Sequence, residues 1–375
     1  ENERVDILAR AVKMNGAVWS EYLNVVGGVN EVNTTLTTGK GHGQAGLEIT
    51  SKAGDSNKPL VWLDVSEIAD VRAGSMYLIG TEAGVGVNQA GRVVAGELKL
   101  DSNGDIEITK TGLMHTSGRA QIRTSGDVNQ SGTMLLSQGS ASGASVHANN
   151  VRLSSSAVLV SGYDLDVRAK ENISAESGSL VGSSMVIDEG GKYQLVGWNV
   201  SKPVGDMVLE ADGTIGLNGR NYSGGEMKLT SHSSDANGVG INLDGATTYS
   251  GENMVMRSSG AVSHVGGKLV SNGGLKVEAM GLNNHLGQMN AQGMSLELRG
   301  DQGLNNSSGA MVSSWWLDVS SSGAVNNQEG KLMGGEQDWV ARKAYLMGAG
   351  MSASAADAQV AQERQYGYVK LQSSG

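Results

Sequence analysis

The sequence predicts an all-β fold, a single-stranded parallel β-helix (solenoid) with about 20–22 residues per coil. The first observation is a repeated pair of apolar residues two positions apart, which is the period of a β-strand. The second residue of the pair recurs at Leu78, Leu100, Ile122, Val167, Ile187, Leu209, Leu229, Met256, Val277, Leu298, Val319 and Ala341. One gap of 45 residues spans two periods, and one gap of 27 includes a short insertion. This regularity indicates stacked coils rather than one globule.

The second observation is a glycine four residues after most of these apolar positions. These glycines are Gly104, Gly126, Gly191, Gly213, Gly260, Gly281 and Gly323. We interpret them as corners of the coil, because glycine adopts left-handed backbone angles without a steric penalty. Further glycine, asparagine and serine residues divide each repeat into about three short strands.

The third observation is the composition, with 56 glycines and only two prolines in 375 residues. Proline removes a backbone donor from a sheet, so its scarcity suits a chain made of strands. A leucine-rich repeat has a similar period. It is disfavoured because the apolar positions accept Leu, Val, Ile and Met, and because no repeat has the spacing of a helix.

Charge and cysteine content narrow the function classes. The formal net charge of −10 and the isoelectric point near 5.1 disfavour nucleic acid and anionic membranes as partners. No apolar run approaches the ~18 residues of a membrane-spanning helix. The chain has no cysteine, but stacked coils support one another without disulfides, so export is not excluded.

The elements can be assigned in order along three predicted regions. Residues 1–68 contain strand signals at Val5 and Ile7 and at Leu23 and Val25, with polar loops at 30–46 and 51–59 and a strand at 47–49 between them. Residues 69–350 form the regular array, interrupted by an insertion at 231–246. Residues 351–375 lose the strand alternation and form an irregular or capping segment, with a short helix predicted after Ser354.

Two stretches of the chain resemble a known family of bacterial exoproteins. VDILARAVKMNGAVWSEYLNVVGGVNEV, from Val5 to Val32, is similar to the end of the secretion domain of two-partner-secretion exoproteins. ADVRAGSMYLIGTEAGVGVNQAG, from Ala69 to Gly91, is similar to the junction into filamentous haemagglutinin repeats. The family's T-E-x-G-V-G-V-x-x-x-G run is matched by Thr81, Glu82, Gly84, Val85, Gly86, Val87 and Gly91.

The resemblance implies a right-handed β-helical stalk of a secreted, cell-surface exoprotein, either an adhesin, a haemolysin or a contact-dependent growth-inhibition toxin. It implies an outer-membrane two-partner-secretion transporter as export partner, and a receptor or glycan on a target cell bound through distal regions. Most of the secretion domain, with its N-P-N-type motifs, is absent from this sequence. On this reading the chain itself is not an enzyme and needs no cofactor.

Two alternatives to a stalk remain open. The side of the solenoid could bind a glycan or receptor directly, and Arg299-Gly300-Asp301, which spells an integrin-binding tripeptide, and Trp315, beside Trp316, are the candidate binding residues. A solvated corner and an isolated surface tryptophan are the simpler interpretations.

The other alternative is a polysaccharide lyase or hydrolase, which requires clustered carboxylates. Asp164 and Asp166, with Asp188 and Glu189, are the candidates for an acidic stripe. Asp101, Asn103 and Asp105 resemble a calcium loop but lack its glutamate. The six histidines are scattered, so we expect no metal site. His264 occupies the usual asparagine position of the repeat, where we expect a corner hydrogen bond.

Overall fold

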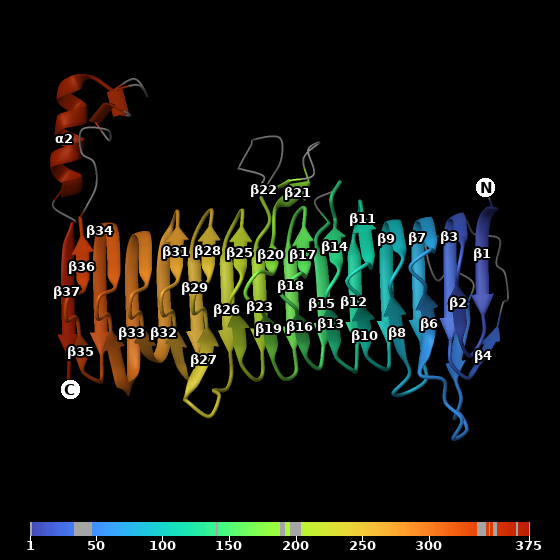
Figure 1. The fold of residues 1–375 in the computed structure, drawn as a ribbon. Helices are drawn as coiled ribbons and strands as arrows, with labels where there is room; N and C mark the ends of the chain where they lie inside the picture. Colours follow the sequence, from blue (N-terminus) through green and yellow to red (C-terminus); the bar gives the residue numbers. More distant parts are fainter. Residues whose placement is uncertain are drawn as a thin grey trace. The chain divides into compact units, whose positions relative to one another are not determined.

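A computed structural model describes most of the chain as β-strands (Figure 1). The described residues are 2–33, 47–139, 142–187, 192–195, 204–335, 343–344, 346–347, 351–364 and 367–374. Contacts divide the chain into two compact units, residues 1–225 and 226–375. Four residues of the sequence predictions lie outside the described residues, namely Asp188, Glu189, Gly191 and Ala341.

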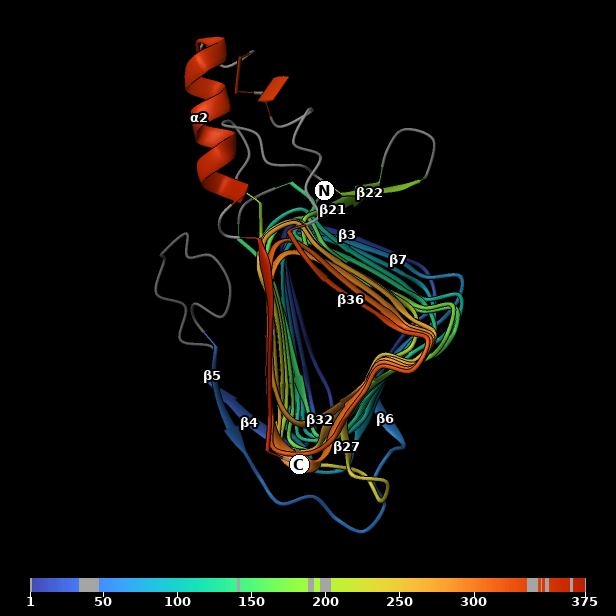
Figure 2. The same ribbon diagram turned by 90° about the vertical axis from the view of Figure 1, so that its left-hand side faces the viewer.

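Each coil of the first unit has three faces, which we call A, B and C in chain order (Figure 2). Face A contains β1 (Asn2–Leu8), β3 (Ala17–Gly27), β7 (Asp70–Gly80), β9 (Arg92–Ser102), β12 (Ala120–Thr124), β15 (Ala144–Ala148), β18 (Leu165–Ala169) and β23 (Met207–Ala211). Face B contains β2 (Val12–Met14), β6 (Val61–Val65), β8 (Gly86–Gln89), β10 (Ile106–Ile108), β13 (Val128–Gln130), β16 (Val151–Leu153), β19 (Ile173–Ala175) and β24 (Ile215–Leu217). Face C contains the first halves of β3, β7 and β9, followed by β11 (Leu113–Thr116), β14 (Thr133–Leu136), β17 (Val158–Ser161), β20 (Leu180–Gly182) and β25 (Arg220–Ser223).

The second unit repeats the same plan. Face A contains β26 (Met227–Ser231), β29 (Met254–Ser258), parts of β32 (Gly274–Asn283), β33 (Gln288–Asn305) and β34 (Ala310–Ser321), and β37 (Tyr368–Ser373). Face B contains β27 (Val239–Asn242), β30 (Ala261–Ser263), the ends of β32 and β33, and β35 (Val325–Asn326). Face C contains β28 (Thr247–Ser250), β31 (Lys268–Ser271), the starts of β33 and β34, and β36 (Lys331–Gly334).

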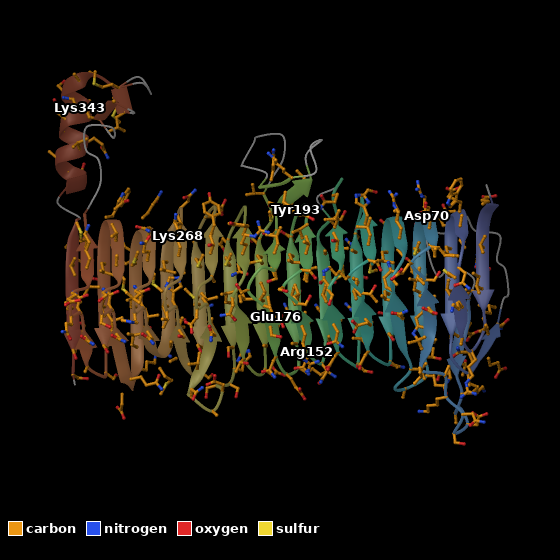
Figure 3. The ribbon with its side chains drawn as sticks, in the orientation of Figure 1. Asp70, Arg152, Glu176, Tyr193, Lys268 and Lys343 are labelled. Carbon is orange, nitrogen blue, oxygen red and sulfur yellow. The ribbon has the colours of Figure 1, made fainter. Side chains whose placement is uncertain are left out.

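Strands on a face pair in parallel with the same face of the next coil, so the predicted right-handed parallel β-helix is confirmed. In Figure 2 the second unit runs from β36 counter-clockwise to β37 and the carboxyl terminus as it approaches the viewer, which is the right-handed sense. Alternate side chains point inward. Val151 and Leu153 are buried, whereas Arg152 between them points outward (Figure 3).

Apolar side chains of successive coils stack into one interior column on face A of the first unit. Neighbours in register along it are Leu78, Leu100, Ile122, Val146, Val167 and Leu209, each at most 3% exposed. Val146 belongs to the coil between Ile122 and Val167, which are 45 residues apart in the sequence. The prediction that this gap spans two periods is therefore confirmed. Burial of such aliphatic side chains provides about 1.5–3 kcal/mol each and is the main stabilisation of the coil.

Two predicted column positions are wrong. Val167 pairs directly with Leu209, while Ile187 lies in β21 (Met185–Ile187), which pairs antiparallel with β22 (Tyr193–Leu195) outside the coil. Leu296, rather than Leu298, pairs with both Val277 and Val319. Alternating apolar residues occur in an excursion as well as in a coil, and β33 contains three of them in a row, so periodicity alone did not select the register.

Segments that leave the coil also differ in part from the prediction. Residues 30–33, expected within a loop, form β4 (Asn30–Asn33), which pairs antiparallel with β5 (Glu48–Ser51). The strand near 47–49 is therefore confirmed, and its partner was missed. The helix predicted after Ser354 is confirmed as α2 (Ala353–Arg364), whose Ala356 and Val360 pack on Leu346. No described helix is both long and apolar enough to cross a membrane.

The corner glycines have a different physical cause from the predicted one. The described members Gly104, Gly126, Gly213, Gly260, Gly281 and Gly323 have no positive φ. A Cβ atom on Gly104 would instead lie 2.5 Å from the backbone carbon of Val85, and one on Gly281 would lie 2.7 Å from Cβ of Gln302. Glycine is required there because the adjacent coil passes too close for any side chain.

Candidate functional site

A groove in the first unit runs across successive strands of face A. Five outward side chains stand in register on β9, β12, β15, β18 and β23, which lie side by side in Figure 1, namely Asp101, Arg123, His147, Arg168 and Glu210. They line a groove of about 640 Å³ together with Lys170 and Asp212, above small residues such as Gly80, Ala148 and Ala169. The register of the coil, rather than any contiguous motif, brings these groups together.

Charged side chains at the edges of this groove form ion pairs with one another. Lys99 Nζ lies 3.1 Å from a carboxylate oxygen of Asp101. Arg168 pairs with Asp166 at 3.0 Å and with Glu210 at 3.2 Å. His147 Nε2 lies 3.5 Å from Asp166. These contacts hold the acidic groups in place and leave the centre of the groove to the cations.

Two cations of the groove have no such partner. Within the described part of the chain, the side chains of Arg123 and Lys170 make no hydrogen bond or ion pair, and both residues are exposed. Arg123 stands one coil before His147 and two coils before Arg168. The groove therefore has a positive centre, with carboxylates at its two ends from Asp101 and from Glu210 and Asp212.

The candidate acidic stripe has a structural role where the structure describes it. Asp164 accepts a hydrogen bond from the Asp206 backbone N–H at 2.9 Å, and Asp166 is paired with Arg168. Nothing in this pair resembles an acid and a base that converge on one substrate. In the described residues no group of three or more His, Cys, Asp or Glu side chains could hold a metal ion.

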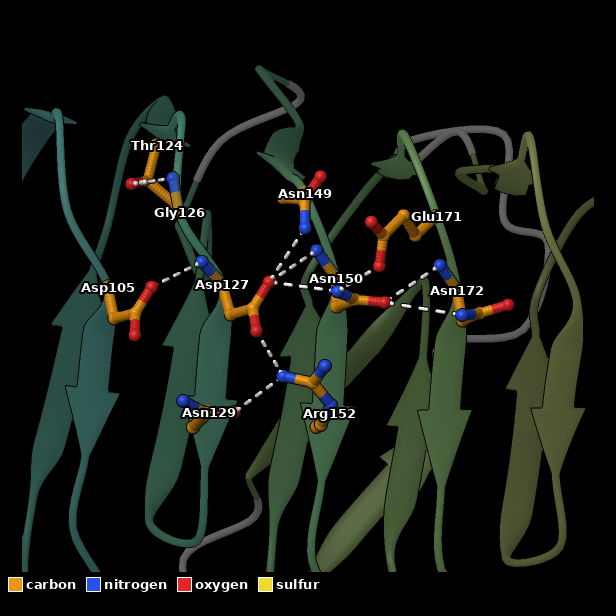
Figure 4. Close-up of polar contacts among 10 residues, drawn as sticks. All are labelled: Asp105, Thr124, Gly126, Asp127, Asn129, Asn149, Asn150, Arg152, Glu171 and Asn172. Carbon is orange, nitrogen blue, oxygen red and sulfur yellow. Dashed lines mark hydrogen bonds and ion pairs between the residues drawn. The ribbon is translucent and has the colours of Figure 1, made fainter. Parts of the chain in front are cut away.

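Polar side chains at the corner before face B link one coil to the next (Figure 4). The Asp127 N–H donates to Asp105 at 2.8 Å, the Asn150 N–H to Asp127 at 3.0 Å, and the Asn172 N–H to Asn150 at 3.0 Å. Burial acts to raise the pKa of Asp127, but hydrogen bonds from Arg152, Asn150 and Asn149 outweigh it and hold that pKa below its usual value. Of the calcium-like triplet, Asp105 belongs to this network and Asp101 to the groove.

Buried amides form a second ladder at the corner before face C of the second unit. His264 Nδ1 lies 2.7 Å from Asn284 Oδ1, Asn284 donates to Asn306 at 2.7 Å, and Asn306 donates to Asn327 at 2.6 Å. The predicted corner hydrogen bond of His264 is confirmed. The repeated Asn-Asn pairs beginning at 283, 305 and 326 were the signal for the rest of this ladder.

The residues matching the family motif fasten the segments outside the first coils. Arg10 donates twice to the carboxylate of Glu82, at 2.8 and 3.1 Å, and once to Asp55 at 2.9 Å. The hydrogen bonds from Arg10 are the main reason that the pKa of the buried Glu82 lies below its ordinary value. The Thr81 hydroxyl bonds Asn30 of the β4–β5 hairpin at 2.6 Å. The motif thus ties the hairpin and the 52–59 segment to the solenoid.

The sequence-predicted binding residues lie in extended strands of the second unit. The guanidinium of Arg299 is engaged by Glu297 at 2.9 Å, and a Cβ on Gly300 would lie 2.6 Å from the Met280 carbonyl oxygen. Asp301 is exposed in the same strand, β33. Trp315 is 39% exposed in β34. The tripeptide lies flat on the coil rather than at the tip of a loop, and a role for these four residues stays a prediction.

Comparison with known proteins gives relatives over part of the chain. A 118-residue region, 31% of the chain, is 36% identical to "Toxin CdiA" of Yersinia pestis. A 109-residue region, 28% of the chain, is 34% identical to "tRNA nuclease CdiA-2" of Burkholderia pseudomallei strain 1026b. The curated relatives of this chain are CdiA toxins. The resemblance to contact-dependent growth-inhibition exoproteins is therefore confirmed.

The chain covers only a small share of those relatives. It spans 3% of the length of each of these two proteins, and 4% of "tRNA nuclease CdiA" of Escherichia coli strain NC101, to which it is 27% identical over 141 residues. No family profile matches the chain, and no solved structure is significantly similar to it.

Proposed function

We propose that the chain is part of the β-solenoid stalk of a secreted, cell-surface exoprotein of the CdiA kind, which displays a toxin or adhesin module at a distance. The observation that supports this role most directly is the parallel pairing of every face with the same face of the next coil. Such stacking allows a protein to grow in one direction by adding coils, because each coil needs only its neighbours.

The same stacking suits export followed by folding outside the cell. Each coil that emerges finds the open edge of the previous coil and adds stability as it pairs. We therefore propose an outer-membrane two-partner-secretion transporter as the export partner. The target-cell receptor or glycan recognised by the distal module, and any toxic activity, would belong to regions that this chain does not contain.

Surface display in the producing bacterium tests the proposal. An epitope inserted in the exposed 232–238 loop, between β26 and β27, leaves the described strands intact. We expect intact cells to bind the antibody and to lose the epitope on protease treatment. A tag protected until the cells are lysed, under conditions in which a known surface protein is cleaved, would contradict the proposal.

A further inference from the structure

We propose that the face A groove of the first unit binds an acidic oligosaccharide, a short linear glycan bearing carboxylates, at Arg123, His147 and Lys170. This goes beyond the stalk function, which requires no ligand. The groove is built from consecutive coils of one unit and has a volume of about 640 Å³. That volume lies within the usual range for a small-ligand site.

The charge state of the groove points to an anion. Arg123 and Lys170 have no side-chain partner among the described residues, so binding an anion there breaks no existing ion pair. A guanidinium presents a planar fork that binds a carboxylate through two parallel hydrogen bonds. Arg123 and His147 stand one coil apart, at roughly 4.8 Å, and Lys170 directly follows the strand of the coil after His147. This arrangement suits a short linear ligand with regularly placed anionic groups.

The lining favours a glycan over an acidic peptide. A peptide is usually anchored by large apolar or aromatic side chains in matching pockets. Among the residues that line this groove there is no Phe, Tyr or Trp, and Ile79 is the only large aliphatic side chain. Ser125 and Asn103 add polar atoms along the same groove, which suits a ligand rich in hydroxyl groups.

The surrounding charges limit the ligand to a short segment and disfavour a membrane. Asp101 closes one end of the positive centre, and Glu210 and Asp212 close the other. An extended anionic polymer would meet these carboxylates. An anionic lipid surface would meet a chain of formal net charge −10, whereas lipid recognition of this kind uses clusters of several Lys and Arg residues.

Binding of a defined probe tests the proposal. The full chain is titrated by calorimetry with oligogalacturonate trimer, with a neutral cello-oligosaccharide of equal length, and with phosphatidylglycerol vesicles. We expect binding of oligogalacturonate alone, weakened by added salt because the charges are screened. Failure of oligogalacturonate to bind, equal binding of the neutral sugar, or binding of vesicles only would each overturn the proposal.

Matched variants locate the site. Arg123→Gln removes the unpaired cation, and Arg119→Gln removes an exposed arginine at the start of the same coil that does not line the groove. We expect Arg123→Gln to weaken oligogalacturonate binding about tenfold or more and Arg119→Gln to change it by less than about twofold. Equal effects of the two variants, with unchanged circular dichroism and melting temperature, would show that the groove is not the site. Surface display does not depend on this groove. A failure of the oligogalacturonate binding experiment would therefore leave the stalk proposal unaffected.

Discussion

At the scale of single residues, crowding between coils explains the glycines better than backbone angle does. A Cβ on Gly213 would lie 2.6 Å from the Glu171 carbonyl oxygen and would also collide with Asn172 of the preceding coil. Gly216, three residues later on β24, has only Asn218 at 3.8 Å. Both glycines lie in the same coil. The preceding coil blocks the Cβ position of Gly213, whereas the Cβ position of Gly216 is open.

This difference predicts opposite tolerance to the same substitution. We expect Gly213→Ala to lower the free energy of unfolding by about 1–3 kcal/mol, because the added methyl group must displace backbone of the preceding coil. Gly216→Ala should change it by less than about 1 kcal/mol, since there is space and the unfolded chain loses freedom. Urea unfolding of both variants measures the values, and equal destabilisation would contradict this explanation.

A second residue-scale prediction concerns pH. Burial, opposed in part by Asn284 and Asp244, holds the pKa of His264 below its ordinary 6.5, so the folded protein keeps this imidazole neutral. The unfolded chain binds a proton on His264 at a higher pH than the folded chain does. Stability from this residue is therefore present above about pH 6.5 and falls as the pH decreases below it.

The variant His264→Asn supplies the control. Asparagine at position 264 can continue the amide ladder without a titrating group. The free energy of unfolding of this variant should therefore decline less than that of the unchanged protein between pH 7.5 and pH 5. Urea midpoints at both pH values give the comparison. Parallel declines would show that His264 does not determine the pH dependence.

At the scale of elements, the segments outside the coil are held by few contacts. The Arg10–Glu82 pair ties the first coils to the 52–59 segment through Asp55. Glu82 is 6% exposed, whereas Glu31, in the β4–β5 hairpin, forms a surface pair with Lys52. Exposed pairs contribute little to stability, and buried ones matter once a partner is removed.

We therefore expect Glu82→Gln to loosen the 52–59 segment and Glu31→Gln to leave it unchanged. Hydrogen exchange of the backbone amides in 52–59 gives the readout, with protection lost in the first variant. Because the folded pKa of Glu82 is depressed, its contribution is present above its ordinary pKa of 4.5 and is lost as the pH falls through the folded value. Unchanged exchange in Glu82→Gln would mean that other contacts hold the segment.

The elements also show how far the sequence could predict the structure. The 20–22-residue period and the strands at Val5 and Ile7 and at Leu23 and Val25 follow from apolar alternation alone, and the structure pairs Val5 with Leu23 and Ile7 with Val25. The excursion containing Ile187 did not, because its strands alternate in the same way as a coil does. Local pattern determines that a segment is a strand, whereas its partner depends on which coil closes around the interior.

The groove was missed for a related reason. Arg123, His147 and Arg168 are separated by 24 and 21 residues, and no local motif includes any two of them. Only the register of β12, β15 and β18 makes them neighbours. Conversely, Arg299-Gly300-Asp301 is a contiguous motif whose arginine is already engaged by Glu297. In a solenoid a surface site is assembled across coils, so motif searches along the chain are poorly suited to finding it.

At the scale of the whole molecule, we expect the coils to be interchangeable units of a stalk. Along face A of the second unit, Met254 pairs with Met227 on one side and with Leu275 on the other. Removing residues 254–274 would place Leu275 directly beside Met227 and keep every later strand on its own face. Removing residues 254–264 instead would delete β29 and β30, so that β31, a face C strand, would stand where a face A strand belongs. Every later strand would then be shifted by one face.

The folding of these two deletion variants shows whether a coil is an independent repeating unit of the stalk. We expect the 21-residue deletion variant to remain soluble and to unfold cooperatively, with a far-ultraviolet circular dichroism spectrum of β-structure. We expect the 11-residue deletion variant to lose cooperative unfolding or to aggregate, although it lacks fewer residues. If the shorter deletion folded as well as the longer one, or if both failed, the coils would not be interchangeable units and the stalk account would be contradicted.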